Sequence, residues 1–311
     1  MSPAVAGSPV CWTRGGRARE KCQMWIRRIA RHVGALIVTT LIAGLLGATL
    51  VRFGPGFDSD EQRLDPRLNA ASIHAIENSG ANEHNLLTFY STFLARFVSG
   101  DWGVSRSLGR SVRELFAERA KVTLNLMAAG VLGGWALGLA LAVPSSMYRA
   151  PVYDFVSTAI SGFFLCVPSA VLALFLFFMN GPLRFAIVLV IFPKVFRYTR
   201  DLLRDAYAQP HVLAARARGL SASRVFLWHA TPWVAPQLLA LAGVSLGMAF
   251  GAAIPVEVLC DLPGVGQLAW KAALARDLPV VVSLTILVAA FTQLANAASD
   301  LAIAACTHER R

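Results

Sequence analysis

The segment Gly243-Val-Ser245-Leu-Gly247 is the part of this sequence most similar to a catalytic motif. The pattern G-x-S-x-G presents a serine nucleophile when it lies on a sharp turn between a strand and a helix. Here it lies inside Ala230 to Val256, a run of 27 residues without an ionised side chain, which predicts a helix. The sequence therefore favours a helix-packing role for this serine, and no catalytic residue is predicted.

Glycine recurs at every fourth position on one face of that predicted helix, and the same spacing occurs in a second uncharged run. The two series are Gly130, Gly134, Gly138 and Gly243, Gly247, Gly251. Such faces let the backbones of two helices approach closely inside a membrane. We expect a tightly packed core, and one arrangement would place the two glycine faces against each other.

Neither a metal centre nor a bound nucleotide is predicted for this chain. The five cysteines and six histidines are scattered, without a C-x-x-C pair or an H-E-x-x-H motif. Only four lysines occur and none follows a glycine, so the phosphate-binding G-K-[ST] of a P-loop is absent. The long apolar runs also lack ionised groups that could bind a coupling ion. Energy for any transport would therefore come from a partner.

The elements that must position these residues are membrane helices. Five uncharged runs of 19 to 29 residues are each long enough to cross a bilayer, and 56% of all residues are hydrophobic. A sixth crossing is expected to end at the basic residues Lys194 and Arg197. The fold class is therefore an all-α polytopic membrane protein with about six transmembrane helices. The predicted spans are 32–52, 122–146, 155–180, 182–199, 233–257 and 278–300.

Basic residues are distributed unevenly along the chain. Residues 1–31 carry seven bases and one acid, residues 194–224 seven bases and two acids, and residues 52–121 nine of each. Cytoplasmic segments of membrane proteins are enriched in Lys and Arg, so this charge indicates topology and not a nucleic-acid partner. We expect a cytoplasmic N-terminal segment 1–31, a cytoplasmic loop 200–232 and a cytoplasmic tail 307–311. The region 53–121 is then extracytoplasmic and 122–306 forms the transmembrane core.

Two features of the N-terminal third stay open. Met1 or Met24 can be the start, and in the second case residues 1–23 are an extension. Patterns at Phe89–Val98 and Val112–Phe116 predict short amphipathic helices near the outer surface. Their role is either to dock a soluble protein or to cover the mouth of the bundle.

The predicted loop 200–232 contains two short helices. The first, from Leu213, ends at Gly219, and the second contains Phe226 and Trp228 among polar neighbours. Exposed apolar and cationic groups on a short helix suit insertion into a groove on a soluble protein. The alternative is a solvated loop.

These residues resemble the cytoplasmic loop of ABC importer inner-membrane permease subunits, and within them the oligopeptide/dipeptide (and nickel) permease family. The family pattern is E-A-A, three residues, G, nine residues and I-x-L-P; Ala214, Ala215, Gly219 and Pro232 match it, while Leu213 replaces Glu. The peptide branch reads A-R-A-[KR]-G-L and later W-H-A, as this loop does. The resemblance assigns ATPase coupling to Ala214, Ala215, Arg216, Arg218, Gly219, Leu220, Phe226, Trp228, His229 and Pro232.

Further motifs extend the resemblance over most of the chain from Met24 onward. Gly100-Asp-Trp-Gly103 and Thr123-Leu124 are similar to family elements before the second span. Glu257, Pro263-Gly-Val-Gly266 and Arg276-Asp-Leu-Pro-Val280 are similar to elements after the fifth. The chain departs from the pattern where Gly54-Pro-Gly-Phe57 replaces P-G-D-P and where Cys260 replaces Phe.

The resemblance implies a type I ABC importer permease in the bacterial inner membrane. Its partners would be a second permease, homologous or identical, two ATP-binding-cassette ATPase subunits and an extracytoplasmic solute-binding protein. ATP and Mg would bind the ATPase, so this chain has no cofactor of its own and is not an enzyme. The solute would be small, with peptides favoured, while nickel and sugars stay open. A secondary transporter and a membrane-embedded enzyme are the alternative function classes.

Several polar residues within the predicted spans are candidates for the translocation path. Each can instead form an interhelical hydrogen bond. The candidates are Asn125, Ser161, Ser169, Ser245, Glu257, Thr285, Gln293 and Asn296.

The charge asymmetry makes a direct topological prediction. An alkaline phosphatase fused after Gly100 should be active, because that position is expected outside the cytoplasm, and one fused after Gly219 should be inactive. Enzyme activity in whole cells, normalised to fusion abundance, is the measurement. The reverse pattern would invert the topology.

Overall fold

The structure is a computed structural model that describes residues 30–47, 49, 86–147 and 150–308. Every regular element in these ranges is a helix, and β pairing is limited to one bridge between Val104 and Ser111. The expected segment 1–23, most of 1–31, residues 53–85 and residues 309–311 lie outside the described residues.

From Val112 onward the helices follow one another along the chain with short connections. In chain order the described helices are an N-terminal helix Ala30–Gly47, α3 Leu86–Val98, α4 Val112–Met147, α5 Pro151–Cys166, α6 Ser169–Phe178, α7 Arg184–Tyr207, α8 Pro210–Ala217, α9 Ala222–Val225, the π-helical turn η2 Phe226–Ala230, α10 Thr231–Leu259, α11 Val265–Leu274 and α12 Leu278–His308.

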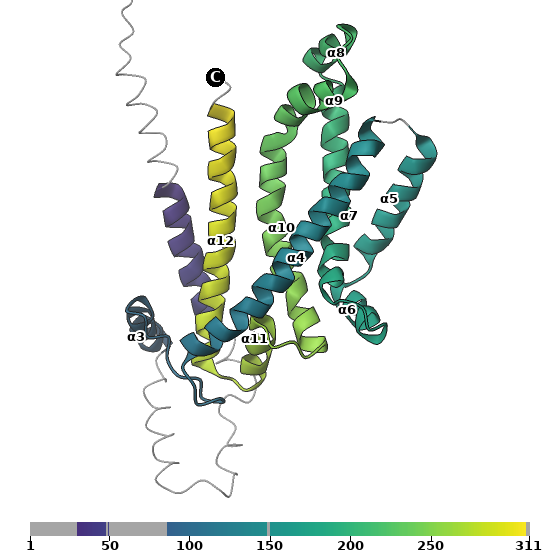
Figure 1. Cartoon of the computed structure of the whole chain (residues 1–311). Coiled ribbons are helices and arrows are strands. Elements are labelled where there is room, and N and C mark those ends of the chain that lie inside the picture. The colour runs from purple at the N-terminus through teal and green to yellow at the C-terminus, as the bar shows by residue number, and fades with distance from the viewer. Residues whose placement is uncertain (1–29, 48, 50–85, 148–149, 309–311) are drawn as a thin grey trace, which may run out of the picture.

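The long helices run between two ends of the molecule (Figure 1). Helices α8 and α9 lie at one end, which we call the α8 end, and α3 and α11 lie at the other, the α11 end. Helix α7 contacts α4, α5, α6 and α10, while α10 also packs along α12. Helix α7 is therefore the central element of the bundle.

The structure confirms the all-α membrane fold class. Among the residues that the structure describes, four helical stretches are long and apolar enough to cross a bilayer: Ala30–Gly47, Val112–Met147, Ala222–Leu259 and Leu278–Cys306. A fifth crossing is formed if α5 and α6, which bend by 97° at their junction, are taken together.

The segment predicted as one span, 155–180, is divided into two helices by this bend. Val167 has an extended backbone (φ −86°, ψ 121°) directly before Pro168. The ring of a proline disfavours helical backbone in the preceding residue. Hydropathy alone did not reveal the break because both halves are apolar.

Helix α7 extends further than the predicted span 182–199. It continues to Tyr207 because Leu203 and Ala206 are buried against Ala230 and Val234. Its 24 residues are about 36 Å long, enough to cross a bilayer, although its charges keep it below the hydropathy of the other spans. The connection predicted over 200–232 accordingly begins only after Tyr207.

Two other predicted boundaries also differ from the observed helices. Helix α4 begins at Val112, before the predicted start at 122, because Val112 and Leu115 pack with Leu268 of α11. The pattern Val112–Phe116 is thus the first turn of α4 and not a separate helix. Helix α12 continues beyond residue 300 to His308 and so includes the start of the predicted tail.

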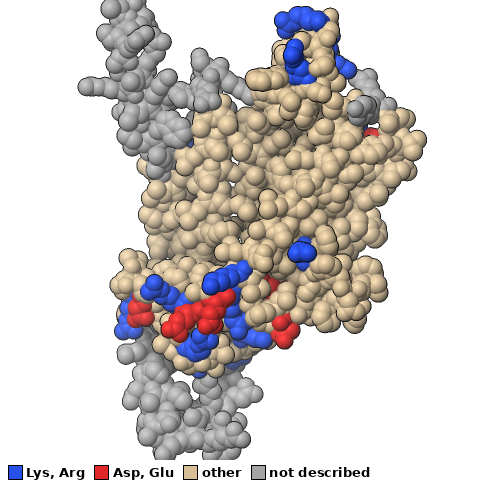
Figure 2. All heavy atoms as spheres, viewed as in Figure 1, with Lys and Arg blue, Asp and Glu red and all other residues tan. Residues whose placement is uncertain are grey.

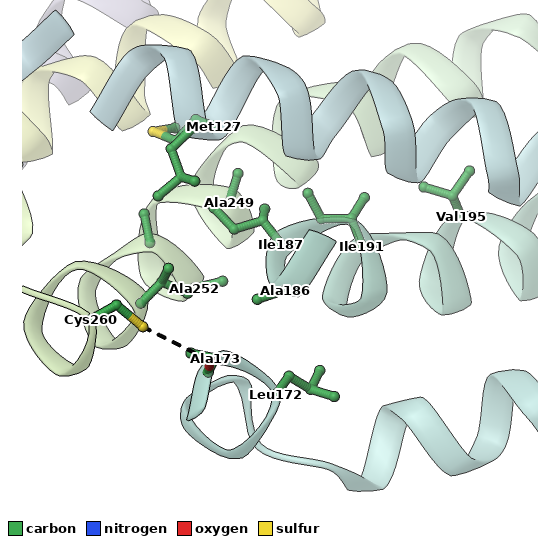
Figure 3. Packing of buried hydrophobic residues seen from close by; sticks show 13 residues of the cluster. Met127, Leu172, Ala173, Ala186, Ile187, Ile191, Val195, Ala249, Ala252 and Cys260 are labelled. Atoms are coloured by element: carbon green, nitrogen blue, oxygen red, sulfur yellow. Dashed lines mark hydrogen bonds between the residues drawn. The ribbon is translucent and has the colours of Figure 1, made fainter. Parts of the chain in front are cut away.

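The contact between α4 and α7 is the most extensive in the fold. Gly130, Gly134 and Gly138 of α4 lie against Ile187, Ile191 and Val195 of α7. A Cβ on Gly134 would come within 2.8 Å of Ile191, and one on Gly138 within 2.7 Å of Val195. Figure 3 shows these α7 side chains directed toward α4 beside Met127.

The second glycine series packs elsewhere. Gly243 of α10 lies against Ser299 of α12. A Cβ added to Gly247 would lie 3.4 Å from the Thr292 side chain, and one added to Gly251 would have no neighbour within 4 Å. The two glycine faces therefore do not pack against each other. Each instead accommodates branched or polar side chains of a different helix.

Gly134→Leu should destabilise the bundle, because its side chain would need the space that Ile191 fills. We expect a loss of at least about 2 kcal/mol and a thermal midpoint lowered by about 5 °C in detergent. Gly251→Leu is the matched control and should leave the midpoint unchanged, since open space surrounds that position. Equal midpoints for the two variants would contradict this account of the α4–α7 contact.

Candidate functional site

The segment from α8 to η2 projects at the α8 end of the molecule (Figure 1). Pro210 occupies the first turn of α8, a position where its missing N–H costs nothing. After α8 ends, Gly219 adopts a positive φ of +76°, which favours glycine. The chain can therefore turn at once into α9, and η2 joins α9 to α10.

A small hydrophobic cluster holds this segment together. Val212, Ala215 and Val225 are almost completely buried, with Tyr207 and Leu220 packed against them. Ala215 therefore packs inside the segment, whereas Ala214 beside it is exposed. The Arg216 guanidinium, 5.8 Å from the centroid of the Tyr207 ring, adds a cation–π contact between α8 and α7.

The outer surface of the segment combines apolar and cationic side chains. Leu213, Leu227 and Trp228 are 50%, 58% and 75% exposed, and Arg216 and Arg218 are also exposed. Figure 2 shows basic side chains gathered at this end. Phe226, His229 and Pro232 are half-buried. A short, rigid segment with these exposed groups can insert into a groove of another protein.

Beside the segment lies a groove of about 1080 Å³ between the α4–α5 turn, α7 and α9. On its wall Asp154 of α5 accepts hydrogen bonds from Arg204 Nη2 (2.7 Å) and Ser145 Oγ (2.8 Å). The buried Arg200 guanidinium lies next to this carboxylate, with its Nη1 3.4 Å from Asp154 Oδ1 and 2.5 Å from Thr158 Oγ1. This ion cluster fastens α5 to α7 near the α8 end.

A second polar cluster surrounds Glu257 toward the α11 end. Its side chain is fully buried and accepts hydrogen bonds from Thr123 Oγ1 (2.7 Å) and the Gly266 amide (2.7 Å). Thr123 Oγ1 in turn accepts from the Val265 amide at 2.8 Å. A Cβ on Gly264 would overlap the Glu257 carboxylate, so the loop can lie this close to Glu257 only because residue 264 is glycine. The cluster ties α4, α10 and α11 together.

Residues 134–307 match the family described as binding-protein-dependent transport system inner membrane component. The match covers more than half of the chain, including the α8–η2 segment. The chain belongs to this family. It is the membrane-spanning permease subunit of an ABC importer, and the ATPase activity resides in a separate subunit.

Curated relatives are similar along nearly their whole length. The oligopeptide transport system permease protein OppB of Escherichia coli K12 is 28% identical over 287 residues, which cover 85% of this chain and 92% of OppB. The di/tripeptide permease protein DppB of Pseudomonas aeruginosa is 25% identical, with coverage of 88% and 95%. AppB of Bacillus subtilis, an oligopeptide permease protein, is also 25% identical, with coverage of 83% and 92%.

A solved structure supports the fold. The MetNI methionine ABC transporter in inward-facing conformations matches with a TM-score of 0.54 at 20% identity. The match covers 62% of this chain and 96% of the MetNI chain. The permease is thus a multi-pass inner-membrane protein of an importer that also uses an ATPase and a substrate-binding protein.

The polar residues predicted for the path lie on α4, α5, α6, α10 and α12. Ser245 accepts from Trp135 Nε1 (3.1 Å), Gln293 donates to Thr39 Oγ1 (3.1 Å), and Glu257 lies in the buried cluster above. Each of these three forms a hydrogen bond to another helix. Asn125 and Asn296 are exposed, and Ser169 is half-buried in the first turn of α6. Ser161 and Thr285 donate to carbonyls of their own helices.

Sequence reasoning missed the cluster of Asp154, Arg200 and Arg204. Asp154 directly precedes the uncharged run 155–183, and an acid at that position needs a partner near the membrane. That signal was available, but it did not identify the arginines. Their pairing depends on how α5 folds back along α7.

Gly264→Ala should destabilise the permease although its backbone (φ −103°, ψ −179°) suits alanine. The methyl group would displace the Glu257 carboxylate and leave buried donors unpaired, at a cost of about 2–4 kcal/mol. The thermal midpoint of the purified permease is the measurement. Gly162→Ala, in open space, is the control. No difference between the two would show that the cluster tolerates expansion.

Proposed function

We propose that this permease imports small peptides, with the α8–η2 segment receiving the motion of the ATPase. The names of OppB, DppB and AppB support the solute class. The observation that carries the coupling role is the exposure of Leu213, Leu227 and Trp228 on a segment fixed by its own hydrophobic cluster.

The proposed docking mode follows from this geometry. The ATPase offers a groove into which the exposed face of α8 and η2 inserts, with Arg216 and Arg218 at its rim. Ala214, which is small and exposed, allows close approach, while Ala215 and Leu220 stabilise the segment from within. Gly219 sets the turn before α9, Pro232 lies in the first turn of α10 directly after η2, and Phe226 and His229 lie half-buried between them.

The proposed topology places the α8 end in the cytoplasm and the α11 end outside. The segment 194–224, which leads to the α8 end, carries seven bases and two acids and supports this orientation, whereas basic and acidic side chains are mixed at the α11 end (Figure 2). The span order would follow the N-terminal helix, α4, the α5–α6 pair, α7, α10 and α12. The solute-binding protein would then dock at the α11 end.

The proposed assembly contains a second permease, homologous or identical, and two ATPase subunits that bind ATP and Mg. ATP-driven closure would favour one of two arrangements of the bundle because the ATPases bind the two differently. The relatives support a bacterial inner membrane as the location.

Trp228→Ala tests the coupling role. Loss of this exposed side chain should weaken ATPase retention by about 2 kcal/mol, or roughly 30-fold, while the permease still inserts normally. Co-purification from detergent at graded ATPase concentrations is the measurement. Trp270→Ala on α11, also 51% exposed, is the control and should retain the ATPase. Equal retention by both variants would refute docking through η2.

A further inference from the structure

The middle of helix α7 is enclosed by its neighbours except along one polar stripe. From residue 191 to residue 200 every side chain is buried except those of Lys194, Arg197 and Tyr198. Asp201 continues the exposed stripe, at a spacing that places all four on one face of the helix. We call these four residues the α7 stripe.

The stripe begins well inside the membrane-spanning part of the bundle. Val195, next to Lys194, packs on Gly138, which lies 10 residues before the end of the uncharged run Val122 to Tyr148. That separation is about 15 Å along α4. The Lys194 ammonium is also 3.7 Å from the Met248 sulfur, in the middle third of α10.

The two cations at this depth have no carboxylate partner in the described part of the chain. Asp201, the acid of the stripe, pairs instead with Arg200 at 3.0 Å. On the same face of α10 as Met248 lie the exposed residues Val244 and Gly251, and neither can neutralise a charge. A cation within a membrane requires water or an anion and marks a functional site by default.

We propose that the α7 stripe lines the translocation path and that Lys194 and Arg197 bind the carboxylate of the passing solute. This inference rests on the proposed function of the chain as a solute path. A lipid-facing position is disfavoured because a cation there costs about 3 kcal/mol. Other outward faces of the bundle differ from the α7 stripe, since α4 and α5 expose apolar side chains such as Leu132 and Phe155.

The first test measures water access and local charge without any solute. Tyr198→Cys is made in a permease whose five native cysteines are replaced, within the assembled importer. Rates of modification by an anionic and a cationic methanethiosulfonate are compared. We expect both reagents to react and the anionic one to be favoured, with K194Q lowering the anion-to-cation rate ratio about tenfold.

The matched control removes a cation from the same helix outside the stripe. R184Q, at the start of α7, should leave the rate ratio unchanged. An unreactive cysteine would show that the stripe is not lined by water, and an equal effect of R184Q and K194Q would show no local cationic site. Either outcome overturns the proposal, whatever solute the importer carries.

The second test uses trialanine as a carboxylate-bearing probe in proteoliposomes with the complete importer. K194Q should lower uptake about tenfold, while K194R, which keeps the cation, should restore at least half of it. R184Q should import at the wild-type rate. Unchanged uptake by K194Q would overturn the proposal. Loss of the second permease from purified K194Q complexes would also overturn it, because Lys194 would then be a contact between subunits. Wild-type importer that rejects trialanine would refute the peptide assignment alone, and the cysteine rates would still decide the stripe.

Discussion

The close contact between α4 and α7 is the constraint on which the rest of the bundle depends. Three glycines on one face of α4 leave room for Ile187, Ile191 and Val195, so the two helices pack along most of their length. Apolar side chains gain little by leaving lipid for a protein interior, and such contacts therefore depend on tight fit. With α7 packed against α4, helices α5, α6 and α10 can pack on the remaining faces of α7.

Polar clusters fix the two ends of this packed unit. Asp154 and its arginines fasten α5 to α7 at one end, while Glu257 and Thr123 fasten α10 and α11 to α4 at the other. In both clusters the buried charge has several hydrogen-bond partners, which compensates for the loss of water. The apolar middle can thus be closely packed while each end keeps a defined geometry.

Helix α7 also connects the two regions to which we assign function. It is continuous from the exposed stripe at Lys194 to Tyr207, and the α8–η2 segment follows after a short turn. A displacement of that segment would act on a continuous helix whose uncovered face carries the cations. The charged residues that make the hydropathy of α7 lower than that of the other spans therefore also give this helix its polar face.

The sequence by itself determined the membrane class, the family and the short helix that ends before Gly219. These properties follow from local composition, from the uncharged runs and from motif spacing such as Ala214, Ala215 and Gly219. Only the tertiary structure decided that Ala215 is buried, that Glu257 is enclosed, and that the two glycine series pack on different helices. It also decided that Lys194 and Arg197 lie within a long helix and not at its end. The physical reason is that burial and charge pairing depend on which helices become neighbours, and no local pattern in the chain specifies those neighbours.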